Sequence, residues 1–488
     1  MTIIILGGYR PVTAGTLHFT GSPTSIDFSE AARVPAPHAN AFLQPPVLRL
    51  GVRTPAAVPE PSMMDVKPLA EPSPAAIQSF FGQDGRFSIP DTMGTVGTQH
   101  VMSTLNDGFR VQDRAGLVLS TMDDEVFWSS AGTSLYHYDP RVVYDPSFGR
   151  WIIVEAYRDQ IRNLAGFSVA VSRTHDPTGL RDRYAFAARP GDWIDYPMAA
   201  LNASTITIAM NSVAPDGTGL NVIYVFDKTG LYSGTGSLSA DYLTRSGDVM
   251  TPVMVVGDDV SVAYLIERLY GANSVRIWRV ANGTFIAVAT VAAPQSWSEN
   301  TPLLPQLGSG VRISPEDTRV TNALLRNGAF WFTQTVFLPA AQAVRSAVQW
   351  WKVSMSGQLV DFGRIDDPSG VVSFCFPTIA VNAKNDVVLG FSQFSANSYP
   401  AAAYAVRSGL DPSGTFRAPV VVKAGEGPYE DVRWGDYSAA ISDPDGATFW
   451  TLQQYAAFPS GGARWGVWWA HIAAPESPVA GKRRAVRH

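Results

Sequence analysis

The sequence predicts an all-β protein, and within that class a seven-bladed β-propeller preceded by an extended, proline-rich N-terminal arm. The first observation behind this prediction is composition. Only 16% of the 488 residues are charged, whereas 42 are glycine, 35 are proline and 11% are aromatic. This balance is typical of short strands joined by turns and disfavours long charged helices. The other two observations are an internal repeat and the turn chemistry inside each repeat.

Each repeat starts with a strand of small or apolar residues, passes through a turn rich in Gly, Asn or Asp, and returns as a strand rich in aromatic or β-branched residues. Such turn residues tolerate positive φ or pre-set the φ that a hairpin needs. Seven units of this kind follow one another at a spacing of roughly 45–70 residues, near the length of known propeller blades. The units are Gly94–Gly116, Arg141–Ser172, Tyr196–Gly230, Pro252–Gly283, Thr321–Val353, Pro377–Arg407 and Tyr437–Ile472. Radial repetition lets each small sheet bury both faces against its neighbours, so the repeat favours a closed ring.

The predicted domain organisation has three parts: the arm over residues 1–88, the propeller over 89–475, and a basic tail over 476–488. Prolines crowd the segment Pro35–Pro74, and proline lacks the amide that a sheet ladder needs. Two short runs in the arm, Thr2–Leu6 and Thr16–Phe19, have strand character. They are expected to pair with each other or to fill a sheet edge, either in this chain or in a neighbouring copy. The second case would make the arm a route to self-association.

Most common functional signals are missing from the sequence. The formal net charge is −5, which gives no general attraction for nucleic acid. The only cysteine, Cys375, lies in an apolar run and is predicted to be a buried, unreactive side chain. No phosphate-binding loop, dinucleotide fingerprint, zinc or haem motif, or GxSxG motif is present, so no nucleotide, haem or zinc is expected. No apolar run reaches the roughly 18 residues of a membrane span, and the N-terminus lacks the basic region of a signal peptide.

One pattern does point to chemistry: acidic residues stand just before the inner strand of several units. These are Asp91, Asp139, Asp195, Asp317 and Asp436. Because the inner strands of a propeller surround its axis, the starts of these strands gather at one mouth of the channel. Carboxylates that converge there are suitable ligands for Ca²⁺, which prefers 6–8 oxygens. The candidate metal set is Asp91, Asp139, Asp195 and Asp436.

Two other interpretations of the same residues remain open. The mouth is equally suited to a polar ligand, because carboxylates beside aromatic rings fit a sugar ring or a cationic group. The candidate ligand-binding set is Asp195, Tyr196, Arg433, Trp434, Asp436 and Tyr437, with Trp193 as a further aromatic candidate. In the third interpretation, the aspartates cap turns and accept hydrogen bonds from backbone amides of their own blade.

Other titratable residues give weaker signals. Glu155 and Glu267 interrupt apolar second strands and are candidates for the paired carboxylates of a glycoside hydrolase. The competing interpretation, a hydrogen-bonded structural carboxylate, is favoured for both. His100 and His137 are placed near the first blades, where a structural role is again favoured over catalysis. No catalytic residue is assigned.

The ordered motifs along the chain resemble a large, mostly uncharacterised family of bacterial secreted or surface seven-bladed β-propellers. The resemblance rests on IPDTMGTVG (89–97), DPRVVYD (139–145), WIDYP (193–197) and RWGDYSAAISDPDG (433–446), and it spans roughly residues 90–475. It implies a seven-bladed propeller and an extracellular or cell-surface setting, and it implies no activity.

The function expected from these observations is a non-enzymatic surface or assembly protein. Its propeller would be a rigid platform for a protein or carbohydrate ligand, tethered or polymerised through the arm. The alternative is an extracellular glycoside hydrolase of the sialidase type that acts at the channel mouth. Propellers serve many functions, so the fold does not decide between the two.

Overall fold

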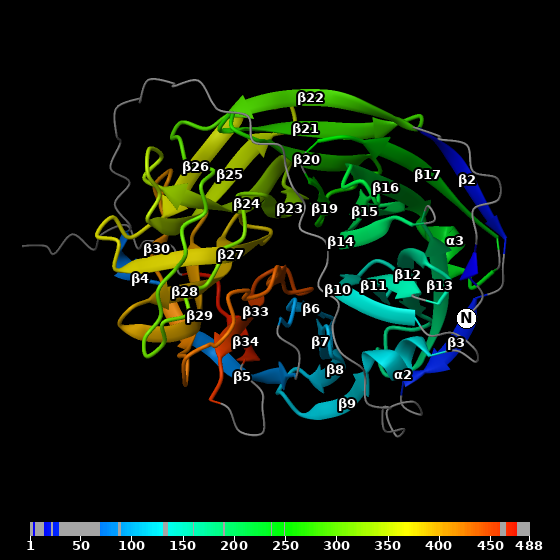
Figure 1. Ribbon diagram of the computed structural model, residues 1–488, viewed down its shortest axis with the longest axis horizontal. Coiled ribbons are helices and arrows are strands. Elements are labelled where there is room, and N and C mark those ends of the chain that lie inside the picture. Colours follow the sequence, from blue (N-terminus) through cyan, green and yellow to red (C-terminus); the bar gives the residue numbers. More distant parts are fainter. Residues whose placement is uncertain are drawn as a thin grey trace, which may run out of the picture.

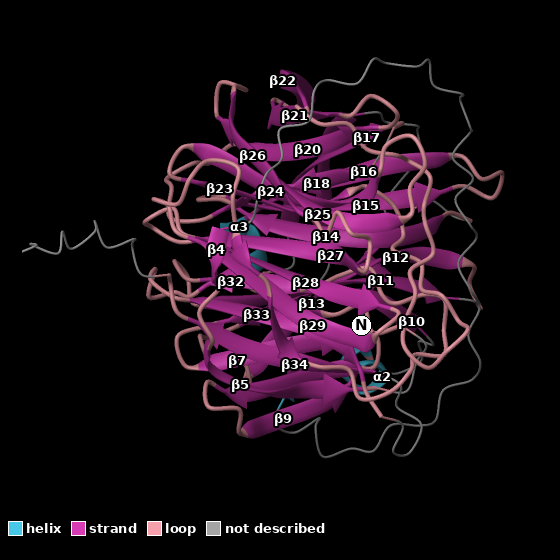
Figure 2. Ribbon diagram, turned by 90° about the vertical axis from the view of Figure 1, so that its left-hand side faces the viewer, coloured by secondary structure: helices cyan, strands magenta, loops and turns pink. Residues whose placement is uncertain are grey.

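The computed structural model describes residues 3–4, 14–20, 23–28, 69–85, 89–129, 135–159, 161–188, 191–235, 237–247, 249–458 and 465–475. Within these residues, the strands form seven blades around a central axis (Figure 1), and the predicted seven-bladed β-propeller is confirmed. Two short helices, α2 (Asp124–Trp128) and α3 (Lys228–Tyr232), follow strands at the blade edges. Nearly all remaining ordered structure is strand, with loops at both faces of the ring (Figure 2).

Each blade is a mostly antiparallel sheet whose first strand lies nearest the axis. The blades are numbered one to seven in chain order. Blade one consists of β6 (Met93–Val96), β7 (His100–Leu105), β8 (Gly108–Asp113) and β9 (Val118–Asp123). Blade two consists of β10 (Leu135–Asp145), β11 (Arg150–Asp159), β12 (Leu164–Ser172) and β13 (Leu180–Ala187). Blade three consists of β14 (Trp193–Leu201), β15 (Thr205–Val213), β16 (Gly219–Asp227) and β17 (Ser237–Arg245).

Blades four and five are linked at the axis, because a short inner strand, β19, leaves blade four and pairs in parallel with blade five. Blade four consists of β18 (Met250–Pro252), β20 (Ala263–Leu269), β21 (Ser274–Ala281) and β22 (Thr284–Ala292). Blade five consists of β19 (Met254–Val255), β23 (Val320–Arg326), β24 (Ala329–Leu338), β25 (Arg345–Ser354) and β26 (Leu359–Ile365). Blade six consists of β27 (Val372–Val381), β28 (Val387–Ser395), β29 (Ser398–Arg407) and β31 (Val420–Lys423).

Blade seven closes the ring with strands from two distant parts of the chain. Its inner strands are β32 (Ala439–Ser442), β33 (Phe449–Ala456) and β34 (Trp465–Ile472), and its outer strand is β5 (Ala76–Asp84). In the antiparallel register between β34 and β5, Trp469 lies opposite Phe80 and Trp468 opposite Phe81. The blades therefore include residues 76–84, which fall outside the range 89–475 predicted from the repeat.

The other described strands of the N-terminal region also pair with strands of this chain, and three of them extend the edge of a blade. Strand β2 (Ala14–Thr20) extends blade three by pairing with β17, and both β1 (Ile3–Ile4) and β3 (Thr24–Asp27) pair with β13 of blade two. Strand β4 (Leu69–Pro72) pairs in parallel with β30 (Arg417–Ala418). Of the two alternatives for the short strand runs, sheet-edge filling within this chain is the one observed. The proline-rich residues 29–68 and the predicted basic tail at 476–488 lie outside the described residues.

The core consists of apolar side chains packed between neighbouring blades. Ile152 and Val154 of blade two, for example, share a cluster with Ile206 and Ile208 of blade three. Tryptophans contribute much of this packing, as predicted, and nine of them are almost fully buried: Trp128, Trp151, Trp331, Trp350, Trp351, Trp434, Trp450, Trp465 and Trp469. Aromatic side chains each bury about 150–250 Å², so they dominate the packing energy between blades. Cys375 is also buried, as predicted.

Candidate binding site at the channel mouth

Three inner strands share a backbone feature at their starts that places side chains at the mouth. Asp139, Tyr196 and Phe376 have φ values of 58°, 53° and 55°, and each precedes a proline. The strand register is broken by a bulge at each of these positions, in blades two, three and six. A positive φ is costly for a residue other than glycine, at about 1–3 kcal/mol. The same positive-φ residue, proline and bulge recur in three blades, so this conformation is a regular part of the fold at this end of the channel.

A continuous chain of hydrogen bonds, here called the mouth clasp, ties four blades together at these strand starts. The Asp436 amide of blade seven donates to Oδ1 of Asp91 in blade one at 2.9 Å, and the side-chain amide of Asn106 donates to Oδ2 of Asp91 at 2.7 Å. Oδ1 of Asn106 accepts from the Asp139 amide at 2.8 Å. Oδ2 of Asp139 in turn accepts from the Tyr196 amide of blade three at 2.9 Å. Asp91 and Asp139 thus accept backbone hydrogen bonds between blades, whereas the third interpretation expected them within one blade. Asp317 follows that interpretation, because it accepts from the Arg319 amide two residues further along at 2.7 Å.

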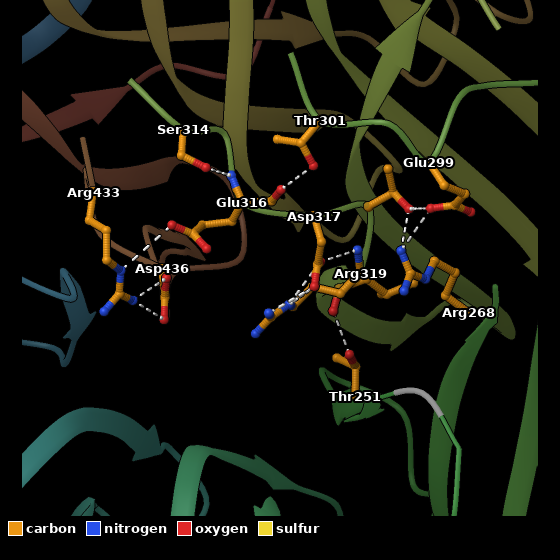
Figure 3. Close-up of polar contacts among 12 residues, drawn as sticks. Thr251, Arg268, Glu299, Thr301, Ser314, Glu316, Asp317, Arg319, Arg433 and Asp436 are labelled. Carbon is orange, nitrogen blue, oxygen red and sulfur yellow. Dashed lines mark hydrogen bonds and ion pairs between the residues drawn. The ribbon is translucent and has the colours of Figure 1, made fainter. Parts of the chain in front are cut away.

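A second group of charged residues, here called the open cluster, lies beside the clasp and is only partly buried. It consists of four carboxyl groups and two guanidinium groups: Asp195, Glu316, Asp317, Asp436, Arg319 and Arg433. Arg433 lies between two of the carboxylates, with its Nε 3.7 Å from Glu316 and its Nη2 3.3 Å from Asp436. Arg319 holds Asp317 through hydrogen bonds of 2.8–3.0 Å (Figure 3). The long connection between β22 and β23 carries Glu316, Asp317 and Arg319 to the mouth.

The electrostatics confirm that these carboxyl groups lie close enough to affect one another. Burial and the nearby charge of Asp436 raise the pKa of Asp91 to about 6 and the pKa of Glu316 to about 7. Burial also raises the pKa of Asp195, and together with the charge of Asp91 it raises the pKa of Asp139 well above its ordinary value. Asp317 is the exception. Although burial acts to raise its pKa, the charge of Arg319 lowers it below the ordinary range. The mouth therefore carries an excess of negative charge that is only partly compensated.

Two tyrosines from opposite sides of the ring close the channel below this mouth. The rings of Tyr196 in blade three and Tyr437 in blade seven lie 4.8 Å apart, and the two side chains are 1% and 4% exposed. The Arg141 guanidinium packs over the Tyr437 ring at 3.3 Å and over the Tyr196 ring at 5.3 Å. Below this plug, an axial cavity of about 690 Å³ is lined by the inner strands of all seven blades. The hydroxyl groups of both tyrosines are buried and have no hydrogen-bond partner among the described residues.

The predicted ligand contact of Trp434 needs correction. Its indole is only 1% exposed, packs against Phe394 and Tyr429, and donates through Nε1 to the Ser392 hydroxyl at 2.9 Å. It therefore fills the core beneath the mouth and does not face a ligand. Trp193 is 9% exposed and stacks on Tyr138, and it lies at the start of β14 away from the plug.

The predicted metal set converges at this mouth, but not in the form of a ready metal site. Within the described residues, no group of three or more His, Cys, Asp or Glu side chains is arranged so that it could hold a metal ion. The clasp accounts for this arrangement, because it commits Asp91 and Asp139 to backbone and amide donors. Calcium at this position remains a prediction.

The glutamates singled out in the sequence have structural partners, as favoured. Glu155 accepts a hydrogen bond from the Trp128 indole at 2.6 Å, and Glu267 accepts one from the Trp278 indole at 2.8 Å. His137 is buried, stacks on Trp128 and pairs with the Ser168 hydroxyl at 2.9 Å, whereas the nearest charges to His100 are Asp176 and His175. None of these residues contributes to the mouth.

Sequence reasoning missed two members of the mouth, Glu316 and Arg319, whereas Arg141 was a candidate, with Arg433 and Tyr437, for the arginine cluster and tyrosine of a sialidase-type site. Arg141 follows the bulge at Asp139, and the recurrence of a proline after a positive-φ position in YDP (138–140), DYP (195–197) and CFP (375–377) is a signal that could have found the bulges. Glu316 and Arg319 lie in the irregular connection before β23, where no strand pattern indicates their direction. Only the folded connection places them beside Arg433.

Comparisons with known proteins assign no family to this chain and carry no argument about its function. No family model matches the chain, and no curated protein matches it either, so the resemblance to bacterial surface propellers stays a prediction. Solved structures with a similar fold include the α-L-arabinofuranosidase Arb93A from Fusarium graminearum in complex with an iminosugar inhibitor, which is 8% identical, with 82% of this chain and 98% of that chain covered and a TM-score of 0.40. The WD40 domain of SCAP from fission yeast is 8% identical, with coverage of 80% and 82% and a TM-score of 0.33. A putative 6-phosphogluconolactonase from Bacteroides fragilis is 12% identical, with coverage of 69% and 85% and a TM-score of 0.38. At these identities and TM-scores, none of them bears on the activity of this chain.

No helix among the described residues is long and apolar enough to cross a membrane.

Proposed function

We propose that this chain is a non-enzymatic binding platform, set on a cell surface or in an extracellular assembly, whose open cluster binds an ammonium group. The observation that carries this proposal is the charge of the open cluster, in which four carboxyl groups face two guanidinium groups. When all of them are ionised, two negative charges remain uncompensated. Burial and, after it, the charge of Asp436 raise the pKa of Glu316 and Asp195, and a cationic ligand would offset the part that comes from this repulsion.

The aromatic plug supports the same ligand class. The Tyr196 and Tyr437 rings already contact one cation, the Arg141 guanidinium. The Arg319 guanidinium also lies over the Tyr196 ring, 4.4 Å from the ring centroid. Aromatic faces beside carboxylates are the usual surroundings of bound cations. Because the plug closes the channel, the ligand stays at the mouth and does not enter the axis.

An ammonium group can come from a protein partner, as a lysine side chain, or from a carbohydrate partner, as an amino sugar. Calorimetric titration of the full chain separates the two sources. Nα-acetyl-lysinamide and glucosamine are the probes, and their N-acetylated forms, which lack the charge, are the controls. We expect at least one charged probe to bind, its acetylated form to bind at least tenfold more weakly, and the probe that binds to identify the source.

Variants at the mouth test the assignment. Asp195→Asn and Asp436→Asn each remove one negative charge, and both keep the backbone amides of Tyr196 and Asp436 that the clasp needs, so binding should weaken at least tenfold. Asp259→Asn is the matched control, because Asp259 is exposed at the opposite end of the channel. Equal binding of the charged and acetylated probes, or unchanged binding in both mouth variants, would refute the proposal.

A glycoside hydrolase is the second candidate, and one observation favours it. Glu316, with a pKa of about 7, lies on the same guanidinium as Asp436. A glutamate that keeps its proton near neutral pH beside a second carboxyl group is the arrangement of a general acid. Sugar release from 4-nitrophenyl glycosides that disappears in both Glu316→Gln and Asp436→Asn would establish this activity. Absence of release from the whole glycoside panel would leave the platform as the better account.

A further inference from the structure

We propose that the axial cavity is a second binding site, separate from the mouth, and that it takes a small organic acid whose carboxylate pairs with Arg326. The cavity has a volume of about 690 Å³, within the range of about 300–1,000 Å³ that small-molecule sites occupy. One end is closed by the plug of Tyr196 and Tyr437. The other end is surrounded by the turns that follow the inner strands, and Arg326 lies among them.

Arg326 is a buried cation whose charge is not neutralised by a direct partner. It is 9% exposed and lines the cavity at the end of β23. Within the described part of the chain, its guanidinium makes no hydrogen bond or ion pair, and its Nε is buried without an acceptor. A buried, unpaired charge is costly, so this position favours an anion that enters from outside.

Three other charged groups on the cavity wall, Asp145, Lys228 and Asp443, already have ionic partners in this chain. Lys228 lies 2.7 Å from Asp145, which also accepts a hydrogen bond from the Tyr232 hydroxyl at 2.8 Å. Asp443 is held by Arg114 and by the Trp450 indole. These groups have little left to offer a ligand, whereas Arg326 presents a planar fork of N–H donors that matches a carboxylate.

The backbone beneath Arg326 leaves the guanidinium in a fixed place. A Cβ added to Gly257 would lie only 3.2 Å from the central carbon of the guanidinium, so the side chain rests closely on this glycine. Gly257 has a φ of 76°, which suits glycine at this turn. The guanidinium is therefore ordered before any ligand arrives, which lowers the entropy cost of binding.

The walls of the cavity define the rest of the ligand. Along the channel, the lining includes Val143, Ala199, Met254 and Ala440 from four different blades. These four side chains are apolar and suit a hydrocarbon body, while Thr321, Asn322 and Thr378 add polar groups to the same wall, so an elongated carboxylate with an apolar chain fits better than inorganic phosphate. Asp258 also lines the cavity near Arg326 and offsets part of its positive charge, which gives the test a variant of opposite sign.

Calorimetric titration of the full chain with octanoate tests the proposal, with octanamide as the uncharged control of equal length. We expect octanoate to bind at one site and octanamide to bind at least tenfold more weakly, which corresponds to about 1.4 kcal/mol. Octanoate that does not bind, or octanamide that binds equally well, would overturn the proposal, and this comparison needs no variant.

Three substitutions place the site. Arg326→Gln should weaken octanoate binding at least tenfold, whereas Asp258→Asn should leave it equal or tighter because a negative charge is lost. Arg312→Gln is the matched control for charge, since Arg312 is exposed and lies outside the cavity. Octanoate binding that is unchanged in Arg326→Gln, or weakened in Asp258→Asn, would also overturn the assignment. Asp436→Asn should bind octanoate as the native chain does, which separates this site from the mouth.

Discussion

The backbone amide of Asp436 donates a 2.9 Å hydrogen bond to Oδ1 of Asp91, and this bond joins the last blade of the ring to the first. It reinforces at the axis the closure that β5 and β34 make at the outer edge. Together, the two contacts hold blade seven against blade one from both sides. The mouth clasp is thus a structural element first, and any ligand at the open cluster binds beside it.

Asp91→Ala should destabilise the fold by about 2–4 kcal/mol, because it leaves the Asp436 amide without its acceptor and leaves the Asn106 side-chain amide with only the Ile89 carbonyl at 3.3 Å. Asp91→Asn keeps one acceptor oxygen and should lose less. Urea unfolding measures both variants, with Asp259→Ala as the exposed control. If Asp91→Ala unfolds at the same urea concentration as the native chain, the clasp does not contribute to stability.

Glu155→Gln should change the pH dependence of stability. Glu155 and Asp124 are buried and share a hydrogen bond; burial raises the pKa of Asp124 to about 7 and, with the charge of Asp124, raises the pKa of Glu155 well above its ordinary value. A carboxyl group whose pKa is higher in the folded state binds more protons folded than unfolded between its unfolded and its folded pKa, a window that opens near pH 4 and reaches about pH 7 for Asp124. Its contribution to stability is therefore full below that window and falls as the pH rises through it.

Glutamine at 155 mimics the protonated acid and removes this fall. From pH 5 to pH 8, Glu155→Gln should gain stability relative to the native chain by about 1 kcal/mol or more. Urea midpoints at the two pH values provide the measurement. Glu430→Gln, at an exposed glutamate, should run parallel to the native chain. A constant difference between Glu155→Gln and the native chain would contradict the expectation.

A chain that begins at Ile89, the boundary predicted from the repeat, should not form a stable ring. It lacks β5, so β34 loses its outer partner and the buried Gln83 no longer accepts from the Ser103 hydroxyl or donates to the Gly108 carbonyl. A chain that begins at Leu69 keeps β5 and should unfold cooperatively at a higher temperature. Circular dichroism melting compares the two, and equal melting temperatures would show that β5 is dispensable.

Arg141→Lys should destabilise the plug, because an ammonium group cannot cover both tyrosine rings and also replace the Nε hydrogen bond to the Pro197 carbonyl at 2.9 Å. The expected loss is about 1–2 kcal/mol in urea unfolding. Arg162→Lys, at a half-exposed arginine, is the control and should change stability by less than about 0.5 kcal/mol. Equal loss in both variants would mean that the stacking contributes nothing of its own.

The class of fold, the seven units and most of the inner strands can be predicted from the amino-acid sequence alone. These features depend on local physics, because strand composition and turn chemistry repeat within each unit and need no distant partner. The same reasoning predicted that Asp91, Asp139, Asp195 and Asp436 lie at one end of the channel, because equivalent positions of the blades lie at the same end of a propeller.

Which strands pair, and which side chains contact one another at the mouth, depends on the three-dimensional fold. The pairing of β5 with β34 and of β2 with β17 joins segments far apart in the chain, and nothing local distinguishes a strand that completes a blade from one in a linker. Glu316 reaches Arg433 through an irregular connection that has no periodic pattern. Trp434 lies in the core although its neighbours in sequence are charged, because its indole packs edge-to-face against Phe394 and Tyr429 and donates to the Ser392 hydroxyl. Which side chains at the mouth are buried, and which residues they contact, thus follows from non-local packing. A single sequence gives no pattern from which such packing can be predicted.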